Sequence, residues 1–220
     1  MIPIICVVGR SNSGKTTVIA NLIPELKKLG YKVATVKHVP HGADFDVNGK
    51  DSWVLSKAGS DITFVSGPGQ IAQFRYSDGD IPLNKLADLA WECDFLIAEG
   101  YKETVYPKIE VLREGTGLDT LCKETELAAV VSDSILDISL RRFSTKEIGK
   151  LARFIVDNYI KPSYSNLNTE LIVNDLPITL NPFAKHLFAR AILGMASALK
   201  GVSKIRRLAV YVKDDLDKTD

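Results

Sequence analysis

The stretch Gly9-Arg10-Ser11-Asn12-Ser13-Gly14-Lys15-Thr16 decides the fold of this 220-residue chain. It matches the phosphate-loop pattern G-x-x-x-x-G-K-[ST] at every defined position. A β-branched apolar run, Ile4 to Val8, precedes it and predicts a buried strand, and helical apolar spacing follows from Lys15 to Lys28. A strand, a glycine-rich loop and a helix in this order indicate a site for a nucleoside triphosphate; the alternative is a loop that merely joins a strand to a helix.

Each residue type in the loop has a physical reason to be there. Glycines allow backbone angles and a close approach that a β-carbon would forbid, and asparagine tolerates left-handed backbone. Successive amide groups can then hold phosphate oxygens, while the lysine reaches the β and γ phosphates and the threonine hydroxyl serves as a Mg²⁺ ligand. We therefore expect nucleotide contacts at Gly9, Ser11, Asn12, Ser13, Gly14, Lys15 and Thr16.

A second Mg²⁺ ligand is expected at the end of a neighbouring parallel strand. Glu99 closes the apolar run Phe95 to Ala98 and precedes Gly100, so it is our candidate for the metal. Asp94 lies at the other end of the same run, where an acid that starts a strand is the better interpretation.

A polar loop follows the second expected strand, Lys32 to Val36. Parallel strands all end at one edge of the sheet, so this loop is a candidate switch that senses the γ-phosphate; the alternative is a solvated surface loop. His38 and His41 have a spacing that suits a metal, but no third ligand is near. The loop comprises Lys37, His38, His41, Asp44, Asp46, Lys50 and Asp51.

Alternating strands and helices predict a doubly wound, mostly parallel α/β sheet of the P-loop NTPase type over residues 1–160. A polar linker, residues 161–168, leads to a small C-terminal ββαβ extension over residues 165–213, whose role stays open. Further strands are expected at 62–66, 70–76, 94–99, 108–112 and 127–131, helices at 51–59, 83–91 and 144–159, and in the extension a hairpin at 171–180, a helix from 182 and a last strand at 208–212.

Composition excludes several classes of protein. Hydrophobic residues make up 45% of the chain and the net charge is +1, which argues against disorder and against a nucleic-acid binder. No apolar run is long enough to span a membrane, and no signal peptide is evident. The 3 cysteines are far apart, so a disulfide framework or a zinc site is not expected and a reducing cytoplasm fits.

Several stretches, in order, make the chain similar to the MobB family, the molybdopterin-guanine dinucleotide biosynthesis protein B. The lysine-histidine pair after the second strand and the Glu-Gly-Tyr-Lys stretch followed by Pro-Lys-Ile are selective as a set. The resemblance covers residues 1 to about 160 and rests on Val8 to Thr17, Val36-Lys37-His38, Asp46 with Gly49-Lys50-Asp51-Ser52, Ala58-Gly59, Ala98-Glu99-Gly100-Tyr101-Lys102 and Pro107-Lys108-Ile109.

The resemblance implies a GTP-binding protein with weak GTPase activity that uses GTP and Mg²⁺. It implies an adapter in molybdenum cofactor biosynthesis, a homodimer, and as partners a MobA-like guanylyltransferase and molybdopterin-binding proteins. By position, Thr17 would join Lys15 and Thr16 at the phosphates and Mg²⁺. Glu99 and Lys102 would lie near the γ-phosphate, and Lys15, Glu99 and Lys102 are the expected catalytic residues. Lys37, His38, Lys50 and Asp51 would form the loop above the γ-phosphate.

Guanine recognition has a single candidate. Asp133 follows an expected strand and would accept from the guanine N1 and N2 groups; the alternative is a plain strand-end cap. No arginine finger is obvious in the sequence, which predicts slow hydrolysis; Arg10 and Arg113 are no more than candidates for one.

Three other functions stay open at this point. A small-molecule kinase would need a lid with arginines, and a metallochaperone-type GTPase would need clustered Cys or His ligands. Residues 165–212 would alternatively form a non-catalytic module that binds a partner.

Overall fold

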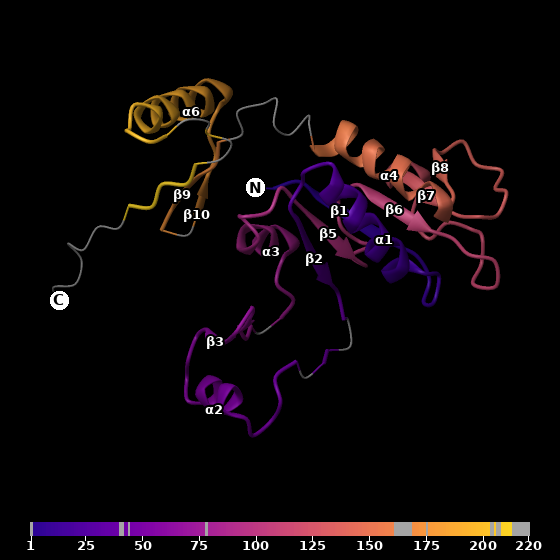
Figure 1. The fold of residues 1–220 in the computed structure, drawn as a ribbon, viewed down its shortest axis with the longest axis horizontal. Helices are drawn as coiled ribbons and strands as arrows, with labels where there is room; N and C mark the ends of the chain where they lie inside the picture. Colours follow the sequence, from indigo (N-terminus) through magenta and orange to yellow (C-terminus); the bar gives the residue numbers. More distant parts are fainter. Residues whose placement is uncertain are drawn as a thin grey trace. The chain divides into compact units, whose positions relative to one another are not determined.

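Six parallel strands form the central sheet, in the order β2-β5-β1-β6-β7-β8 (Figure 1). This confirms the mostly parallel α/β sheet of the P-loop NTPase type. The two-residue β8 was not predicted, because so short a segment has no recognisable alternation. The strands are β1 Ile4–Val8, β2 Val33–Lys37, β5 Phe95–Glu99, β6 Lys108–Val111, β7 Leu127–Val131 and β8 Arg142–Phe143.

The computed structural model describes residues 2–39, 42–43, 45–77, 79–160, 169–174, 176–202, 205 and 208–212. The chain divides into two compact units, Met1–Ile160 and Lys161–Asp220. His41, Asp44 and the linker at 161–168 lie outside the described residues. The helices of the first unit are α1 Lys15–Lys28, α2 Asp51–Lys57, α3 Leu83–Leu89 and α4 Ile148–Ile155, the last continued by a π-helical turn, Val156–Ile160; short 3₁₀ turns lie at Glu124–Glu126 and Thr145–Glu147.

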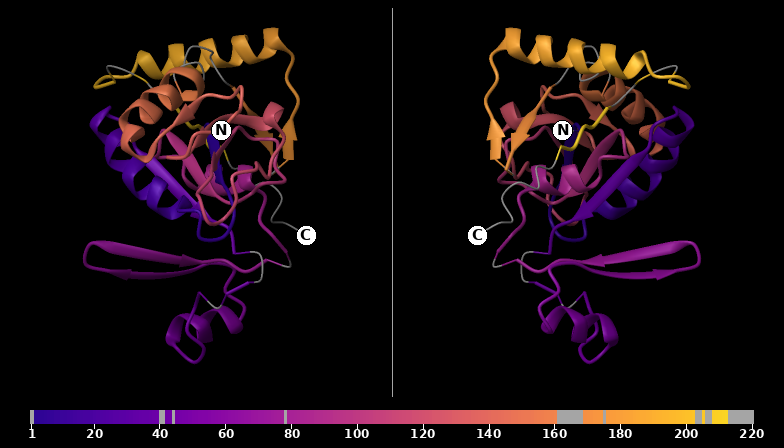
Figure 2. Two further views of the ribbon diagram at one scale, coloured as in Figure 1. Left: turned by 90° about the vertical axis from the view of Figure 1, so that its right-hand side faces the viewer. Right: turned by 90° about the vertical axis from the view of Figure 1, so that its left-hand side faces the viewer.

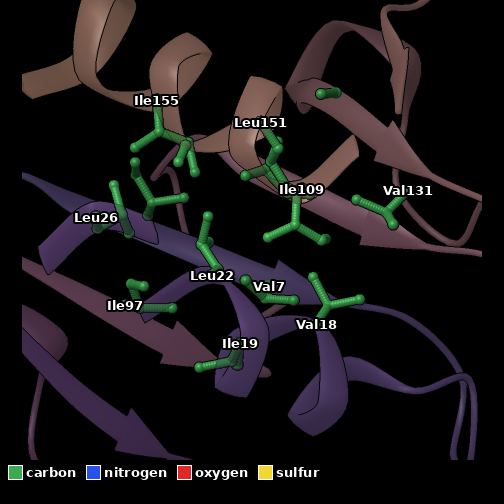
Figure 3. Packing of buried hydrophobic residues seen from close by; sticks show 14 of the residues in the cluster. Val7, Val18, Ile19, Leu22, Leu26, Ile97, Ile109, Val131, Leu151 and Ile155 are labelled. Atoms are coloured by element: carbon green, nitrogen blue, oxygen red, sulfur yellow. The ribbon is translucent and has the colours of Figure 1, made fainter. Parts of the chain in front are cut away.

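Helices α1 and α4 cover one face of the sheet. Leu22 and Leu26 from α1 and Leu151 and Ile155 from α4 point toward alternate residues of the strands, such as Ile97 (Figure 3). The other face carries a second apolar cluster that includes α3 and the loops after β5 and β7. Strands covered on both faces need apolar residues at every position, which is why the sequence of β1 shows no alternation.

Strands β3, Thr63–Gly67, and β4, Gln70–Phe74, form a separate antiparallel hairpin (Figure 2). Both strands were expected, but they do not join the parallel sheet. Most of their side chains are exposed, and Phe64 and Ile71 are among the exposed apolar residues. Together with α2, the hairpin forms an insertion between β2 and α3.

The second unit contains a hairpin, β9 Leu171–Val173 and β10 Leu176–Ile178, and a helix, α6 Pro182–Ser197. The expected N-terminal cap of α6 is confirmed, because the Asn181 side chain accepts a 2.8 Å hydrogen bond from the Ala184 amide. The expected last strand is wrong. Residues 208–212 form no strand and pair with none of the strands that the structure describes, so the unit is ββα and not ββαβ there.

No helix within the described part of the chain is long and apolar enough to cross a membrane.

Candidate nucleotide site

The phosphate loop takes backbone angles that require its glycines. Gly9 has φ 142° and Gly14 has φ 98°, and Asn12, at φ 62°, is one of the few non-glycine residues in the left-handed region. A β-carbon on Gly9 would lie 2.5 Å from the Val111 carbonyl oxygen and 2.7 Å from Ser13 Oγ. The loop therefore passes against the end of β6 too closely for any side chain at position 9.

The Lys15 amine lies across the loop. It donates hydrogen bonds to the carbonyl oxygens of Gly9, at 3.0 Å, and Arg10, at 2.8 Å. The Ser13 hydroxyl is buried in the same loop and is the one buried side-chain polar atom without a partner among the described residues. An ammonium and an unsatisfied hydroxyl at a helix N-terminus suit phosphate oxygens.

Glu99 lies where three strands end. It pairs with Val7 of β1 on one side and with Lys37 of β2 on the other. One of its carboxylate oxygens accepts a 2.8 Å hydrogen bond from the Thr16 hydroxyl, and the other lies 3.6 Å from the Lys37 amine. Asp94, at the opposite end of the strand, instead accepts from the Lys32 amide at 2.6 Å.

The donor set at Thr16 and Glu99 fits Mg²⁺. Mg²⁺ prefers oxygen ligands, and proteins commonly supply one or two of them while the nucleotide phosphates and water supply the rest. A hydroxyl and a carboxylate within 2.8 Å of each other, beside a phosphate loop, meet that need. Outside this pair, the described residues contain no cluster of three His, Cys, Asp or Glu side chains that could hold a metal, so His38 is not part of such a cluster there.

His38 borders the site through backbone and ring contacts. Its amide donates to the Glu99 carbonyl at 3.1 Å, and its ring stacks on Tyr101 with centroids 4.7 Å apart. Its Nε2 lies 3.3 Å from Asp80 Oδ2. Tyr101 has φ 59°, a left-handed conformation that is uncommon for an aromatic residue.

Other candidates lie in different surroundings. Lys102 is exposed, and its amine lies 3.6 Å from a carboxylate oxygen of Glu103. Asp51 begins α2, and the first turn of that helix is tied to Asp46 by a 2.7 Å hydrogen bond from Ser52 Oγ. Thr17 and Ser11 are exposed at the start of α1 and in the loop.

Asp133 makes its hydrogen bonds with Thr145. Its Oδ1 accepts from the Thr145 amide at 2.8 Å, and its Oδ2 accepts from the Thr145 hydroxyl at 2.7 Å. These hydrogen bonds lower the pKa of the Asp133 carboxyl. The geometry is that of a cap joining the end of β7 to the start of the α4 region, which favours the alternative interpretation of this residue.

Arg10 lies across a neighbouring turn. Its Nη1 donates to the Asp119 carbonyl at 2.9 Å, and its guanidinium covers Gly117 so closely that a β-carbon there would lie 2.6 Å from Nη1. Arg113 takes part in a backbone bridge with the same glycine. Both candidate finger arginines therefore belong to the turn that flanks the loop.

The contacts of two residues near this site were not predicted from the sequence, although Lys108 belongs to the Pro-Lys-Ile stretch. Asp80 reaches His38 because the insertion folds back before α3, and no motif marks that return. Lys108 is almost fully buried, although its position in a buried strand predicts an apolar side chain.

An all-parallel sheet whose first strand enters a helix through this loop, with a hydroxyl–carboxylate pair at the next strand end, defines a P-loop nucleotide-binding α/β protein. The chain belongs to the MobB family: the family model for molybdopterin guanine dinucleotide synthesis protein B matches residues 4–133. The resemblance seen in the sequence is thereby confirmed.

Individual relatives agree with this assignment. The chain is 31% identical over 163 residues to the molybdopterin-guanine dinucleotide biosynthesis adapter protein of Escherichia coli, covering 71% of this chain and 93% of that one. A putative adapter protein of the same kind from Methanocaldococcus jannaschii is 26% identical and matches 95% of this chain, so its similarity extends into the second unit. The crystal structure of Bacillus subtilis MobB superposes with a TM-score of 0.54 at 27% identity, over 70% of this chain and 98% of that one.

Proposed function

We propose that this protein is a GTP-binding adapter of molybdenum cofactor biosynthesis that hydrolyses GTP slowly. The single observation that carries the nucleotide part is the arrangement of Lys15, Thr16 and Glu99 around the phosphate loop. The adapter part rests on the family and on the names of its relatives.

The loop amides and the N-terminus of α1 hold the phosphates, and the Lys15 ammonium neutralises their charge. Thr16 and Glu99 hold Mg²⁺, which supplies further neutralisation of charge when it is bound. Lys37 keeps the Glu99 carboxylate in place through their 3.6 Å ion pair.

Hydrolysis follows the ordinary course of phosphoryl transfer. A water oxygen bonds to the γ-phosphorus as the bond to the β–γ bridging oxygen breaks, and the products are GDP and inorganic phosphate. Lys102 is proposed to meet the γ-phosphate charge from the loop after β5. The reaction is slow because Arg10 is already bonded to the Asp119 carbonyl, so this guanidinium is not directed at the phosphates.

The proposal extends to partners and assembly. Residues 1–160 are proposed as the nucleotide-binding domain, and the second unit as an extension that leaves nucleotide binding to the first. We propose a homodimer that assists a MobA-like guanylyltransferase and contacts molybdopterin-binding proteins, in keeping with the adapter named in the relatives.

Calorimetric titration with GTP, GDP and ATP, each with Mg²⁺, tests the nucleotide part. We expect GTP to bind more tightly than ATP, and incubation with GTP to release phosphate slowly. Binding of none of the three would refute the proposal. Transfer of the γ-phosphate to a small molecule in a cell extract would favour the kinase alternative instead.

A further inference from the structure

Lys108 is a buried cation to which the proposed function assigns no role. Its side chain is 2% exposed at the start of β6, and its amine lies 3.6 Å from a carboxylate oxygen of Glu126. Lysine is rarely buried to this extent unless it is paired. The pairing of β6 with β7 shifts register between Lys108 and Ile109, an irregularity of the kind that re-aims a side chain.

Lys108 contacts an unusual connection between two strands of the sheet. Residues 100–107 join β5 to β6, which flank β1 on opposite sides, and they contain no helix. Parallel strands are usually joined by a longer crossover with a helix that packs on the sheet. Here the crossover has no helix, and it is restrained by a hydrogen bond that the Lys108 amine donates to the Thr104 carbonyl oxygen.

Thr104 links Lys108 to the residues that directly follow Glu99. Its hydroxyl donates to the Tyr101 carbonyl at 2.8 Å, and its amide donates to the same oxygen at 3.2 Å. Gly100, at φ 94°, and Tyr101, at φ 59°, are consecutive left-handed residues directly after Glu99. Left-handed backbone at an aromatic residue is strained and persists only where its surroundings hold it.

We propose that Lys108 is a positioning residue for GTP hydrolysis, which fixes the loop from Gly100 to Thr104 and so places Lys102 at the γ-phosphate. The inference rests on the proposed function, since it concerns the same site. It identifies what the Pro-Lys-Ile stretch contributes, although this stretch lies away from the phosphate loop.

Glu110 is a matched control for a purely structural role. It lies two residues further along β6 and is fully buried, and its carboxylate accepts hydrogen bonds from the amides of Leu121, at 2.7 Å, and Cys122, at 3.2 Å. It therefore restrains a different loop. Glu110→Gln alters this buried group, and among the described residues no hydrogen bond or ion pair joins Glu110 to residues 100–104.

The experiment compares Lys108→Met, Thr104→Val and Glu110→Gln in the full chain. Steady-state turnover separates kcat from KM for GTP, and hydrogen exchange follows peptides that cover residues 100–106. For Lys108→Met we expect kcat to fall about 10- to 100-fold, with KM changed by less than about threefold and faster exchange in this loop. Thr104→Val is expected to change kcat and exchange in the same direction, and Glu110→Gln to lower the melting temperature with kcat unchanged.

A Lys108→Met protein with wild-type kcat and wild-type exchange would overturn the proposal, and so would Glu110→Gln lowering kcat as much as Lys108→Met. If Lys108→Met does not fold, Thr104→Val decides, and wild-type kcat and exchange in that variant count against positioning. Failure of the wild-type protein to bind or hydrolyse GTP refutes the proposed function, while exchange in residues 100–106 still tests whether Lys108 holds the loop.

Discussion

The Thr16 hydroxyl and the Glu99 carboxylate are joined by a 2.8 Å hydrogen bond that links the first turn of α1 to the end of β5. Residues 83 positions apart thereby present two oxygen ligands at one place. The pairing of Glu99 with both neighbouring strands fixes its backbone at this edge of the sheet.

Glu99→Gln is expected to weaken the Mg²⁺-dependent part of GTP binding by about tenfold or more, because an amide oxygen is a poorer ligand than a carboxylate. Affinity measured in EDTA should be unchanged. Calorimetry with and without Mg²⁺ measures both, and Asp94→Asn at the other end of β5 is the control. Equal Mg²⁺ dependence in Glu99→Gln and the wild type would remove Glu99 from the metal site.

Lys15→Ala is expected to reduce GTP affinity by about 100-fold, since a charged hydrogen bond to phosphate contributes about 1.5–3 kcal/mol. Lys27→Ala, in the last turn of the same helix, should bind GTP as the wild type does. Titration of the two variants side by side checks this. Undiminished affinity in Lys15→Ala contradicts the assignment of the phosphate loop.

Gly9→Ala is expected to lower the free energy of unfolding by at least about 2 kcal/mol and to abolish GTP binding. The new methyl group would lie 2.5 Å from the Val111 carbonyl oxygen, at a φ of 142° that alanine does not adopt. Gly194→Ala, inside α6 with nothing near its β-carbon, should be neutral or stabilising by up to about 1 kcal/mol. Denaturant unfolding of both variants gives the comparison, and similar losses in the two would argue against a tight contact at Gly9.

Glu147 gives a prediction on pH. Hydrogen bonds from Lys150 and from Ser144 lower the pKa of its carboxyl from 4.5 to about 2. A lowered pKa means that the carboxylate stabilises the fold fully above about pH 4.5 and loses this effect as the pH falls through about 2. Lys150→Ala should move the titration midpoint, followed by NMR of the Glu147 carboxyl carbon, back toward 4.5.

Lys146→Ala is the control for this titration, because Lys146 makes none of the interactions that lower the pKa of Glu147. Its midpoint should match the wild type. A Lys150→Ala midpoint that also stays near 2 would show that the Lys150 amine is not the main cause of the low pKa.

Local patterns predicted the parts of the fold that depend on neighbours in sequence. The glycine spacing around Lys15 and the apolar run to Val8 were enough for the first strand, loop and helix. The apolar run ending at Glu99 predicted an acid at the carboxyl end of a strand. A buried parallel strand can be recognised from its continuous apolar run, and the chain direction shows which end is the carboxyl end. The cap at Asn181 was predictable for the same reason, since its partner is only three residues away.

Features that depend on distant partners could not be predicted in this way. The segments of β3 and β4 have strand-like sequences, but only the folded chain decides that they pair with each other and not with the sheet. The run at 208–212 resembles a strand and finds no partner strand in the described structure. No spacing in the sequence reveals the contacts of Asp80 with His38 and of Lys108 with the Thr104 carbonyl oxygen.

The crossover from Gly100 to Pro107 also shields a buried cysteine thiol. It covers Cys6, whose Sγ lies 3.6 Å from Thr104 Oγ1, and burial raises the pKa of this thiol and of the Cys122 thiol. Both thiols therefore stay protonated at neutral pH, and the buried Cys6 sulfur is shielded from alkylating reagents. The rate at which iodoacetamide modifies Cys6 therefore reports how often this side of the sheet opens transiently. Mass spectrometry measures that rate without any engineered label.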